Sequence, residues 1–157
     1  MDKKYVTADA DMADAIYRVL HTTIETIYPR YYPKEATEFF CRNHSREHVL
    51  EGIGSGNMGV LMENHVIVGT GCFDRNHITG VYVLPAYQKR GCGSQIMDHL
   101  EAEIAKRYDT AVLDASLPAV CLYEKRGYRT VGHGIYELEN EGKLVYEIME
   151  KGLRGTR

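Results

Sequence analysis

The stretch VYVLPAYQKRGCGSQIM, residues 81–97, decides the fold of this chain. It opens with β-branched and aromatic residues, breaks at Pro85, and passes through a basic loop that contains glycine before apolar residues recur at helical spacing. This order predicts a strand, a short loop and a helix. The first turn of such a helix presents unpaired backbone N–H groups and about half a unit of positive charge. Because Gly91 and Gly93 carry no Cβ, the loop is suited to bind a phosphate or pyrophosphate.

The loop QKRGCG, residues 88–93, resembles the (Gln/Arg)-x-x-Gly-x-(Gly/Ala) signature of the GNAT superfamily of N-acetyltransferases. The residues before it, YVLPAY, are similar to the end of that family's fourth strand. In the family the loop binds the pyrophosphate of acetyl-CoA, and the strand hydrogen-bonds its pantetheine arm. The resemblance implies acetyl-CoA as cosubstrate, with these contact residues: Val81, Tyr82, Val83, Gln88, Lys89, Arg90, Gly91, Cys92, Gly93 and Ser94.

A second block, SLPAVCLYEKRGYR at residues 116–129, is similar to the family's N-x-x-A-x-x-x-Y-x-x-x-G-(F/Y) pattern. Ala119, Tyr123 and Gly127 fall on that pattern, and Ser116 stands where the family usually has Asn. We count Ser116 among the acetyl-CoA contacts. With both blocks in family order, the resemblance covers nearly the whole chain. It implies a mixed α/β (α+β) fold of GNAT type, in which a twisted, mainly antiparallel sheet has a parallel, splayed central junction and helices on both faces.

The composition bounds the possible classes of protein. A chain of 157 residues is one domain, taken as 1–157, and can bury about two thirds of its unfolded surface. Its net charge of −3 argues against a nucleic-acid or membrane-surface binder. No apolar run approaches the roughly 20 residues of a membrane span, and the four cysteines show no paired spacing. We therefore expect a cytoplasmic protein with reduced thiols. The oligomeric state is left open, and a homodimer is one of the states allowed.

The hydrophobic pattern predicts an alternation of strands and helices along the chain. Three glycines, Gly52, Gly54 and Gly56, precede a strand-like segment and are interpreted as a loop. The strand after the second family block returns from a turn at residues 139–143. Strands are predicted at 3–7, 58–62, 65–73, 77–84, 111–114, 128–136 and 144–149. Helices are predicted from Asp9 or Asp11 to about 27, over 34–43, from the end of the 88–93 loop to about 106, and from 116 to Gly127.

Tyr123 is the candidate general acid, because it matches the acid position of the family. A free thiol has a pKa near 8.5 and a free tyrosine one near 10, so a phenol can protonate a departing thiolate at neutral pH. The alternative is a core tyrosine one turn before Gly127.

The sequence indicates the residues that bind the acceptor amine less clearly than those that bind acetyl-CoA. The segment IYPRYY makes Tyr28, Tyr31 and Tyr32 candidates for the pocket wall, although aromatic packing beneath a loop explains them equally well. His77 would share a strand face with Val81 if the strand is regular, whereas a bulge would turn its side chain away. A bound water can serve as the base, so we assign no protein base.

Two further patterns favour structural explanations. Cys41, His44 and His48 have a spacing that a metal site could use on one continuous helix, but Ser45 is expected to interrupt that helix as a cap. We expect surface histidines there and no metal. Cys92 stands at a helix start, where a thiol can become reactive, but we interpret it as a small side chain that fills space.

The leading hypothesis is therefore direct transfer of an acetyl group from acetyl-CoA to a primary amine, in a ternary complex without an acetyl-enzyme. The amine belongs either to a small molecule or to a protein. One alternative changes the donor to a longer acyl-CoA or the acceptor to a hydroxyl. Another is a non-catalytic acyl-CoA sensor.

Overall fold

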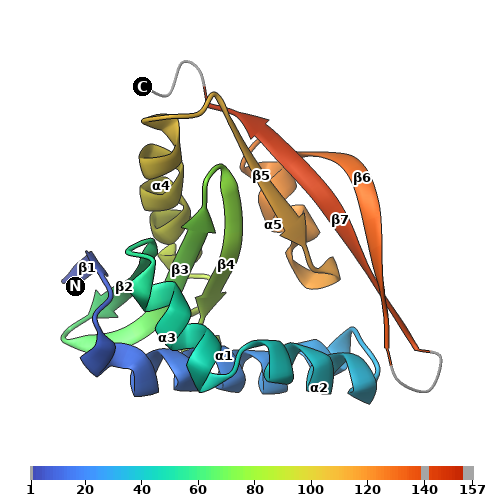
Figure 1. Ribbon diagram of the computed structural model, residues 1–157, viewed down its shortest axis with the longest axis horizontal. Coiled ribbons are helices and arrows are strands. Elements are labelled where there is room, and N and C mark those ends of the chain that lie inside the picture. The colour runs from blue at the N-terminus through green and yellow to red at the C-terminus, as the bar shows by residue number, and fades with distance from the viewer. Residues whose placement is uncertain (1, 139–141, 154–157) are drawn as a thin grey trace.

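The computed structural model describes residues 2–138 and 142–153 (Figure 1). The strands are β1 (Lys3–Thr7), β2 (Met58–Glu63), β3 (Val66–Asp74), β4 (His77–Val83), β5 (Thr110–Ala115), β6 (Arg129–Glu137) and β7 (Lys143–Gly152). The helices are α1 (Ala13–Ile27), α2 (Lys34–Asn43), α3 (Arg46–Gly54), α4 (Cys92–Ala105) and α5 (Val120–Lys125). Short 3-10 turns precede or follow them, namely η1 (Ala10–Met12), η2 (Tyr28–Arg30), η3 (Pro85–Tyr87) and η4 (Leu117–Ala119).

All seven strands form one sheet in the order β1-β2-β3-β4-β5-β7-β6. Among the described residues β4 and β5 are its only parallel neighbours, and the other pairs are antiparallel. Two parallel strands need a crossover connection, which α4 provides here. The predicted mixed sheet with a parallel central junction is therefore confirmed.

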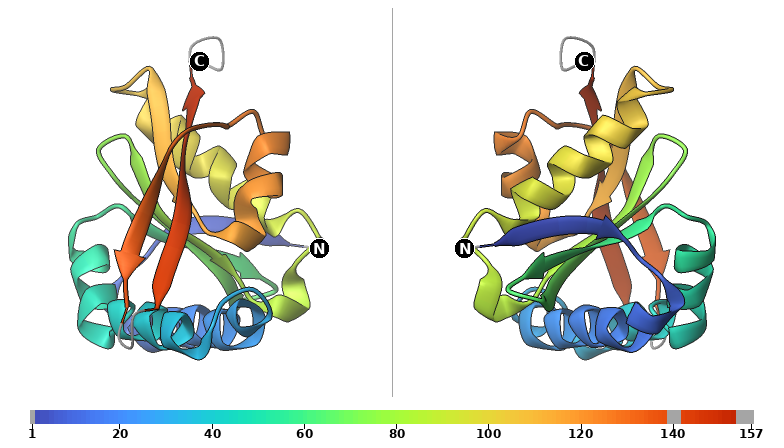
Figure 2. Two further views of the ribbon diagram at one scale, coloured as in Figure 1. Left: turned by 90° about the vertical axis from the view of Figure 1, so that its right-hand side faces the viewer. Right: turned by 90° about the vertical axis from the view of Figure 1, so that its left-hand side faces the viewer.

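Helices cover both faces of the sheet. Adjacent residues of β2 point to opposite faces, so Leu61 packs into the core under α4 while Val60 packs with α1 and α3. Ile96 and Leu100 give α4 its buried side, and Ile16 and Leu20 do the same for α1. Figure 2 shows α1, α2 and α3 along one face, with α4 and α5 on the other.

The two central strands separate soon after they meet. The register pairs His77 with Val112 and Ile78 with Leu113, and no further residues of β4 and β5 are paired. β4 nevertheless continues to Val83, and Figure 1 shows the two strands diverging. A bulge lies at the start of β4, because the register to β3 skips Thr79.

The segment between α2 and β2 differs from the prediction. Gly52 and Gly54 belong to α3 instead of a loop. Ser45 caps this helix by accepting a hydrogen bond from the His48 backbone N–H at 3.1 Å, as expected, and it separates α2 from α3. The predicted turn at 139–143 falls partly on residues 139–141, which lie outside the described residues. Within the described part of the chain, none of the helices has the length and apolar character needed to cross a bilayer.

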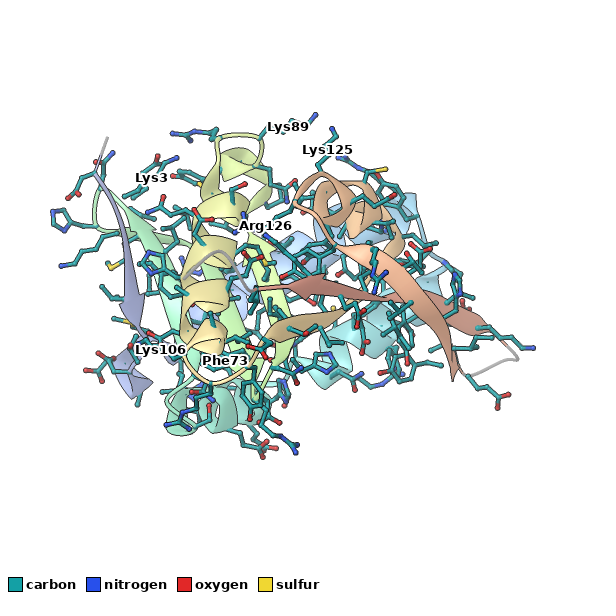
Figure 3. The ribbon with its side chains drawn as sticks, turned by 90° about the horizontal axis from the view of Figure 1, so that it is seen from above. Lys3, Phe73, Lys89, Lys106, Lys125 and Arg126 are labelled. Carbon is teal, nitrogen blue, oxygen red and sulfur yellow. The ribbon has the colours of Figure 1, made fainter. Side chains whose placement is uncertain are left out.

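A buried ion cluster fixes α4 against α5 and β7. The Glu101 carboxylate accepts hydrogen bonds from Arg126 Nε at 2.8 Å, Tyr128 Oη at 2.8 Å and Lys151 Nζ at 3.2 Å. Arg126 also binds Asp98 at 2.6 Å, and Figure 3 shows it lying toward α4. Since Arg126 follows α5 directly, the cluster sets the position of the helix that carries Tyr123.

Candidate active site

The loop after β4 leaves the first turn of α4 open. Gly91 is the N-cap residue of that helix, with φ of +83°, and no side chain caps the turn. A Cβ added to Gly91 or Gly93 would meet nothing within 4 Å, so the space beside these backbone groups is free for a ligand atom. Left-handed backbone at Gly91 favours glycine, whereas Lys89 adopts φ of +62° with a side chain present. The geometry matches an anion-binding helix start.

Two charged side chains of the loop have different surroundings, since Arg90 contacts β2 and Lys89 lines a cleft. Arg90 forms an ion pair with the buried carboxylate of Glu63 at 2.9 Å, and its carbonyl accepts a bond from Lys3 Nζ at 2.7 Å. Its guanidinium therefore ties the loop to β2, and a contact of Arg90 with a phosphate stays a prediction. Lys89 lines the cleft beside Gly91, and Figure 3 shows it on the same side of the molecule as Lys125.

The exposed edge of β4 offers backbone groups to the gap beside β5. Leu84 N–H donates to the Val68 carbonyl at 2.9 Å, and antiparallel ladders alternate, so Tyr82 directs its backbone groups to β3. Val81 and Val83 direct theirs the other way. The Val83 carbonyl accepts bonds from Thr23 Oγ1 at 3.2 Å and Gln88 Nε2 at 3.0 Å. Gln88 thus braces the loop, and Val81 directs its backbone groups into the gap.

A cleft of about 320 Å³ runs from this strand edge to the start of α4. Its lining includes Ser94 from the helix and Ser116 and Leu122 from the second family block. Cys92 is only 1% exposed and packs in the hydrophobic core between α4 and the sheet. The space-filling interpretation of Cys92 therefore agrees with its burial.

A second cavity of about 440 Å³ lies between the α2 region and the hairpin of β6 and β7. Phe and Tyr side chains form much of its wall, and the polar lining residues are Asn43, His44, His48, Thr79, Asp114 and Ser116. Tyr136 and Tyr146 are stacked at 5.0 Å across the hairpin. The aromatic lining consists of Tyr28, Phe39, Phe40, Tyr82, Tyr123, Tyr136 and Tyr146.

Tyr123 lines both cavities, together with Tyr28, Ser116 and Ala119. Its ring packs edge-on against Tyr128, with centroids 5.8 Å apart. Burial, reinforced by Tyr28, raises the pKa of Tyr123 above its ordinary value, despite the opposing effect of Arg126. The phenol therefore keeps its proton at neutral pH, at the point where the two cavities meet.

The predicted acceptor residues are only partly brought together. Tyr28 is buried and lines both cavities; burial raises its pKa, while hydrogen bonds with Tyr82 and Ser116 oppose the rise. Tyr32 is also buried, but its hydroxyl accepts a bond from Leu117 N–H at 2.6 Å and it lines neither cavity. Tyr31 is 54% exposed and lines neither one. The packing explanation therefore holds for Tyr32, and Tyr31 lies outside the pocket.

His77 also lies outside the acceptor cavity. It lies 3.6 Å from Asp114, with both side chains partly exposed, and is absent from the cavity wall. The bulge at Thr79 breaks the alternation that would have given His77 the same face as Val81. Of the two alternatives for His77, the structure has the bulge that turns its side chain away from the pocket.

His44 is the main wall residue that sequence reasoning missed. It was expected on the surface, yet it is half-buried at the end of α2, with Nε2 3.0 Å from the Tyr82 hydroxyl. Burial, with smaller effects of His48 and His21, lowers its pKa to about 4, so it is neutral at physiological pH. The sequence singled it out only by its spacing to Cys41 and His48, which does not indicate a place in the acceptor wall.

Comparisons with known proteins agree with this geometry. The family model of the acetyltransferase (GNAT) domain matches residues 27–142. The catalytic subunit NAA20 of the N-terminal acetyltransferase B complex of Arabidopsis thaliana is 36% identical over 86 residues, which are 52% of this chain and 48% of that protein. The chain thus spans about half the length of this curated relative.

Two of the solved structures that share the fold illustrate the likeness. The GCN5-related N-acetyltransferase of Rhodopseudomonas palustris superposes with a TM-score of 0.89 at 21% identity, covering 97% of this chain and 96% of its own. The PaiA N-acetyltransferase of Thermoplasma acidophilum, solved in complex with coenzyme A, gives 0.77 at 16% identity, with 97% and 99% covered. At these identities the likeness extends to the fold alone.

Proposed function

The chain belongs to the GNAT acetyltransferase family, whose acetyl donor is acetyl-CoA, and on that premise we propose that it transfers the acetyl group directly to a primary amine in a ternary complex. One observation supports this most strongly. A cleft that begins at the open turn of α4 and an aromatic cavity on the acceptor side meet at a protonated phenol, Tyr123. A donor and an acceptor held in the two spaces would have their reacting atoms at that point.

The donor is held largely by backbone groups. The pyrophosphate of acetyl-CoA lies on the amides of residues 91–94, where glycine leaves room, and Lys89 adds positive charge. The pantetheine amides pair with the free edge of β4 at Val81, as an added strand would. Ser116, in place of the family's Asn, contributes a hydroxyl on the opposite wall.

In the transfer step, the lone pair of the neutral amine attacks the thioester carbonyl carbon. The C–S bond breaks when the tetrahedral intermediate collapses, and the departing thiolate takes the proton of the Tyr123 hydroxyl. The nitrogen loses its extra proton to water, and that water restores the proton of Tyr123. Charge and atoms balance without a covalent enzyme intermediate.

The acceptor cavity favours an amine on a flat or apolar body. Aromatic rings surround the space, and Asp114 supplies a carboxylate to attract the ammonium form. A cavity of about 440 Å³ suits a small molecule or the first residue or two of a peptide. The similarity to an N-terminal acetyltransferase subunit makes a protein N-terminus the second candidate acceptor.

Two measurements test the proposal together. Acetyl-CoA at about 100 times its dissociation constant should stabilise the fold by about 2.7 kcal/mol, seen as a higher melting temperature. A panel of small aromatic, aliphatic and peptide N-terminal amines, with free thiol as readout, should yield at least one substrate. Thermal stabilisation without thiol release from any amine would indicate a sensor. Absence of stabilisation by any acyl-CoA would contradict the cleft assignment.

A further inference from the structure

Three metal-ligand side chains of different kinds converge between α1 and α2, away from both cavities. One ring nitrogen of His21, a carboxylate oxygen of Glu25 and the Sγ of Cys41 lie within 4.8 Å of one another. His21 and Glu25 are one turn apart on the same face of α1, and Cys41 faces them from α2. The Cys41 Sγ is 4.0 Å from Glu25 Oε1.

The imidazole of His21 is held as ligating imidazoles usually are. Its Nε2 lies 2.7 Å from the backbone carbonyl of His44, an acceptor, so Nε2 carries the proton in the neutral ring and Nδ1 keeps a lone pair. Ligating histidines almost always donate their second nitrogen to a carbonyl or carboxylate in this way. Stacking on Tyr17, with centroids 3.9 Å apart, fixes the ring further.

The chemistry and charge of this group fit one class of ion. An imidazole, a carboxylate and a thiolate together carry two negative charges, which balance a divalent cation. Burial, Glu25 and Glu38 raise the pKa of the Cys41 thiol, so zinc would displace the thiol proton when it binds. A mixed N, O, S donor set is typical of zinc, whose bonds to these atoms are about 2.0–2.3 Å long. His21 and Cys41 are half-buried and Glu25 is exposed, so an ion can enter and water can complete the coordination.

We propose that His21, Glu25 and Cys41 form a zinc site that fastens α2 to α1. The consequence extends to the acceptor wall, because α2 carries Phe39 and Phe40, and the His44 carbonyl is bonded to the same imidazole. This site does not depend on the proposed acetyl transfer. It also differs from the Cys41, His44 and His48 arrangement considered from the sequence, since His21 and Glu25 come from α1.

The test uses the full chain stripped of metal with a chelator. Zinc titrated by calorimetry should bind with a stoichiometry of one per chain and raise the melting temperature. Cobalt in its place should give the sulfur-to-metal charge-transfer absorption of a thiolate ligand. Cys41→Ser and Glu25→Gln should each weaken zinc binding about tenfold or more, since even an outer-shell change costs 10–100-fold. Cys41→Ser should also abolish the cobalt band.

Matched controls keep the result readable. Cys121→Ser removes an exposed thiol, and His48→Ala an exposed imidazole, both outside the group, so zinc affinity should stay at the wild-type value. Circular dichroism of the metal-free variants separates loss of binding from loss of fold. No binding to the wild type, or equal affinity in Cys41→Ser and wild type, overturns the proposal. Loss of zinc binding in His48→Ala would show that the ion lies at another site and would also overturn the proposal.

Discussion

Replacing Glu101 with glutamine should destabilise the fold by much more than its small change in shape suggests. Each carboxylate oxygen of Glu101 accepts two hydrogen bonds. Oε1 accepts them from Arg126 at 3.0 Å and Lys151 at 3.2 Å, and Oε2 accepts them from Arg126 at 2.8 Å and Tyr128 at 2.8 Å. The amide of glutamine must place its NH₂ group at one of these positions. At that position the NH₂ group would face an N–H or O–H donor. Arg126 and Lys151 would also lose the negative charge that balances theirs.

The magnitude follows from the bonds that are lost. Two hydrogen bonds to a charged group contribute about 1.5–3 kcal/mol each. Arg126 and Lys151 retain 17% and 19% of their side-chain exposure, and Arg126 keeps Asp98, so the lower end applies. We expect Glu101→Gln to lower the free energy of unfolding by about 3 kcal/mol. For a chain of this size that corresponds to a melting temperature roughly 6–12 °C lower.

The same contacts predict a dependence on pH. Burial by itself raises the pKa of Glu101, but hydrogen bonds from Arg126, Tyr128 and Lys151 outweigh it and bring the pKa below the ordinary 4.5. A carboxyl with a depressed folded pKa contributes stability that is present above its unfolded pKa and is lost as the pH falls through the folded pKa. The difference between wild type and Glu101→Gln should therefore be full at pH 7 and shrink below about pH 4.5.

The assay is urea unfolding followed by circular dichroism, across that pH range. Glu103→Gln is the matched control, because its carboxylate pairs with Lys106 at 3.0 Å on an exposed helix face. That control should change stability by less than about 0.5 kcal/mol. If Glu101→Gln is no more destabilised than Glu103→Gln, or if the difference does not narrow in acid, the reasoning about the cluster is wrong.

Three further predictions concern the proposed site. Tyr123→Phe should lower kcat about 10²-fold or more, with acetyl-CoA affinity by calorimetry unchanged, because only the proton donor is lost; unaltered turnover would remove it as the acid. Gly91→Val should weaken acetyl-CoA binding, since φ of +83° strains a β-branched residue although its Cβ meets no atom; wild-type affinity would place the pyrophosphate elsewhere. A thiol reagent should label exposed Cys121 quickly and Cys92 only on unfolding, as mass spectrometry of peptides can follow; early labelling of Cys92 would contradict its burial.

The fold was predictable wherever apolar residues recur with the clear spacing of a helix or a strand. Residues 3–7 and 34–43 form the predicted strand and helix, and Asp9 caps the first helical segment as expected. α3 was missed because Gly52 and Gly54 interrupt a helix of nine residues, and glycine within a helix costs about 1 kcal/mol relative to alanine. Its single buried position, Val49, and the Ser45 cap were weaker signals than two glycines.

The candidate site was predictable where a short local pattern holds it. The loop around Gly91 and the position of Tyr123 follow from contiguous motifs. The acceptor wall does not, because Phe40 comes from α2, His44 is the C-cap of that helix and Tyr146 comes from β7, and their convergence depends on how α2 packs against the β6–β7 hairpin. The choice between Tyr31 and Tyr28 depends on which way each side chain points from a 3-10 turn, which sequence spacing does not fix.

The divergence of β5 from β4 links the energetics of the fold to binding. After Leu113, β5 pairs with β7 alone, through Asp114 with Ile148 and Ala115 with Glu147. If β5 had followed β4 to its end, the backbone of Val81 would be satisfied inside the sheet and Tyr123 would be an ordinary core residue. Instead, polar backbone groups face a partly apolar cleft, where they require water or a ligand amide as partner. In the binding mode proposed above, the pantetheine arm would restore the missing strand contacts, and the sheet would gain stability from the same hydrogen bonds that place the thioester beside Tyr123.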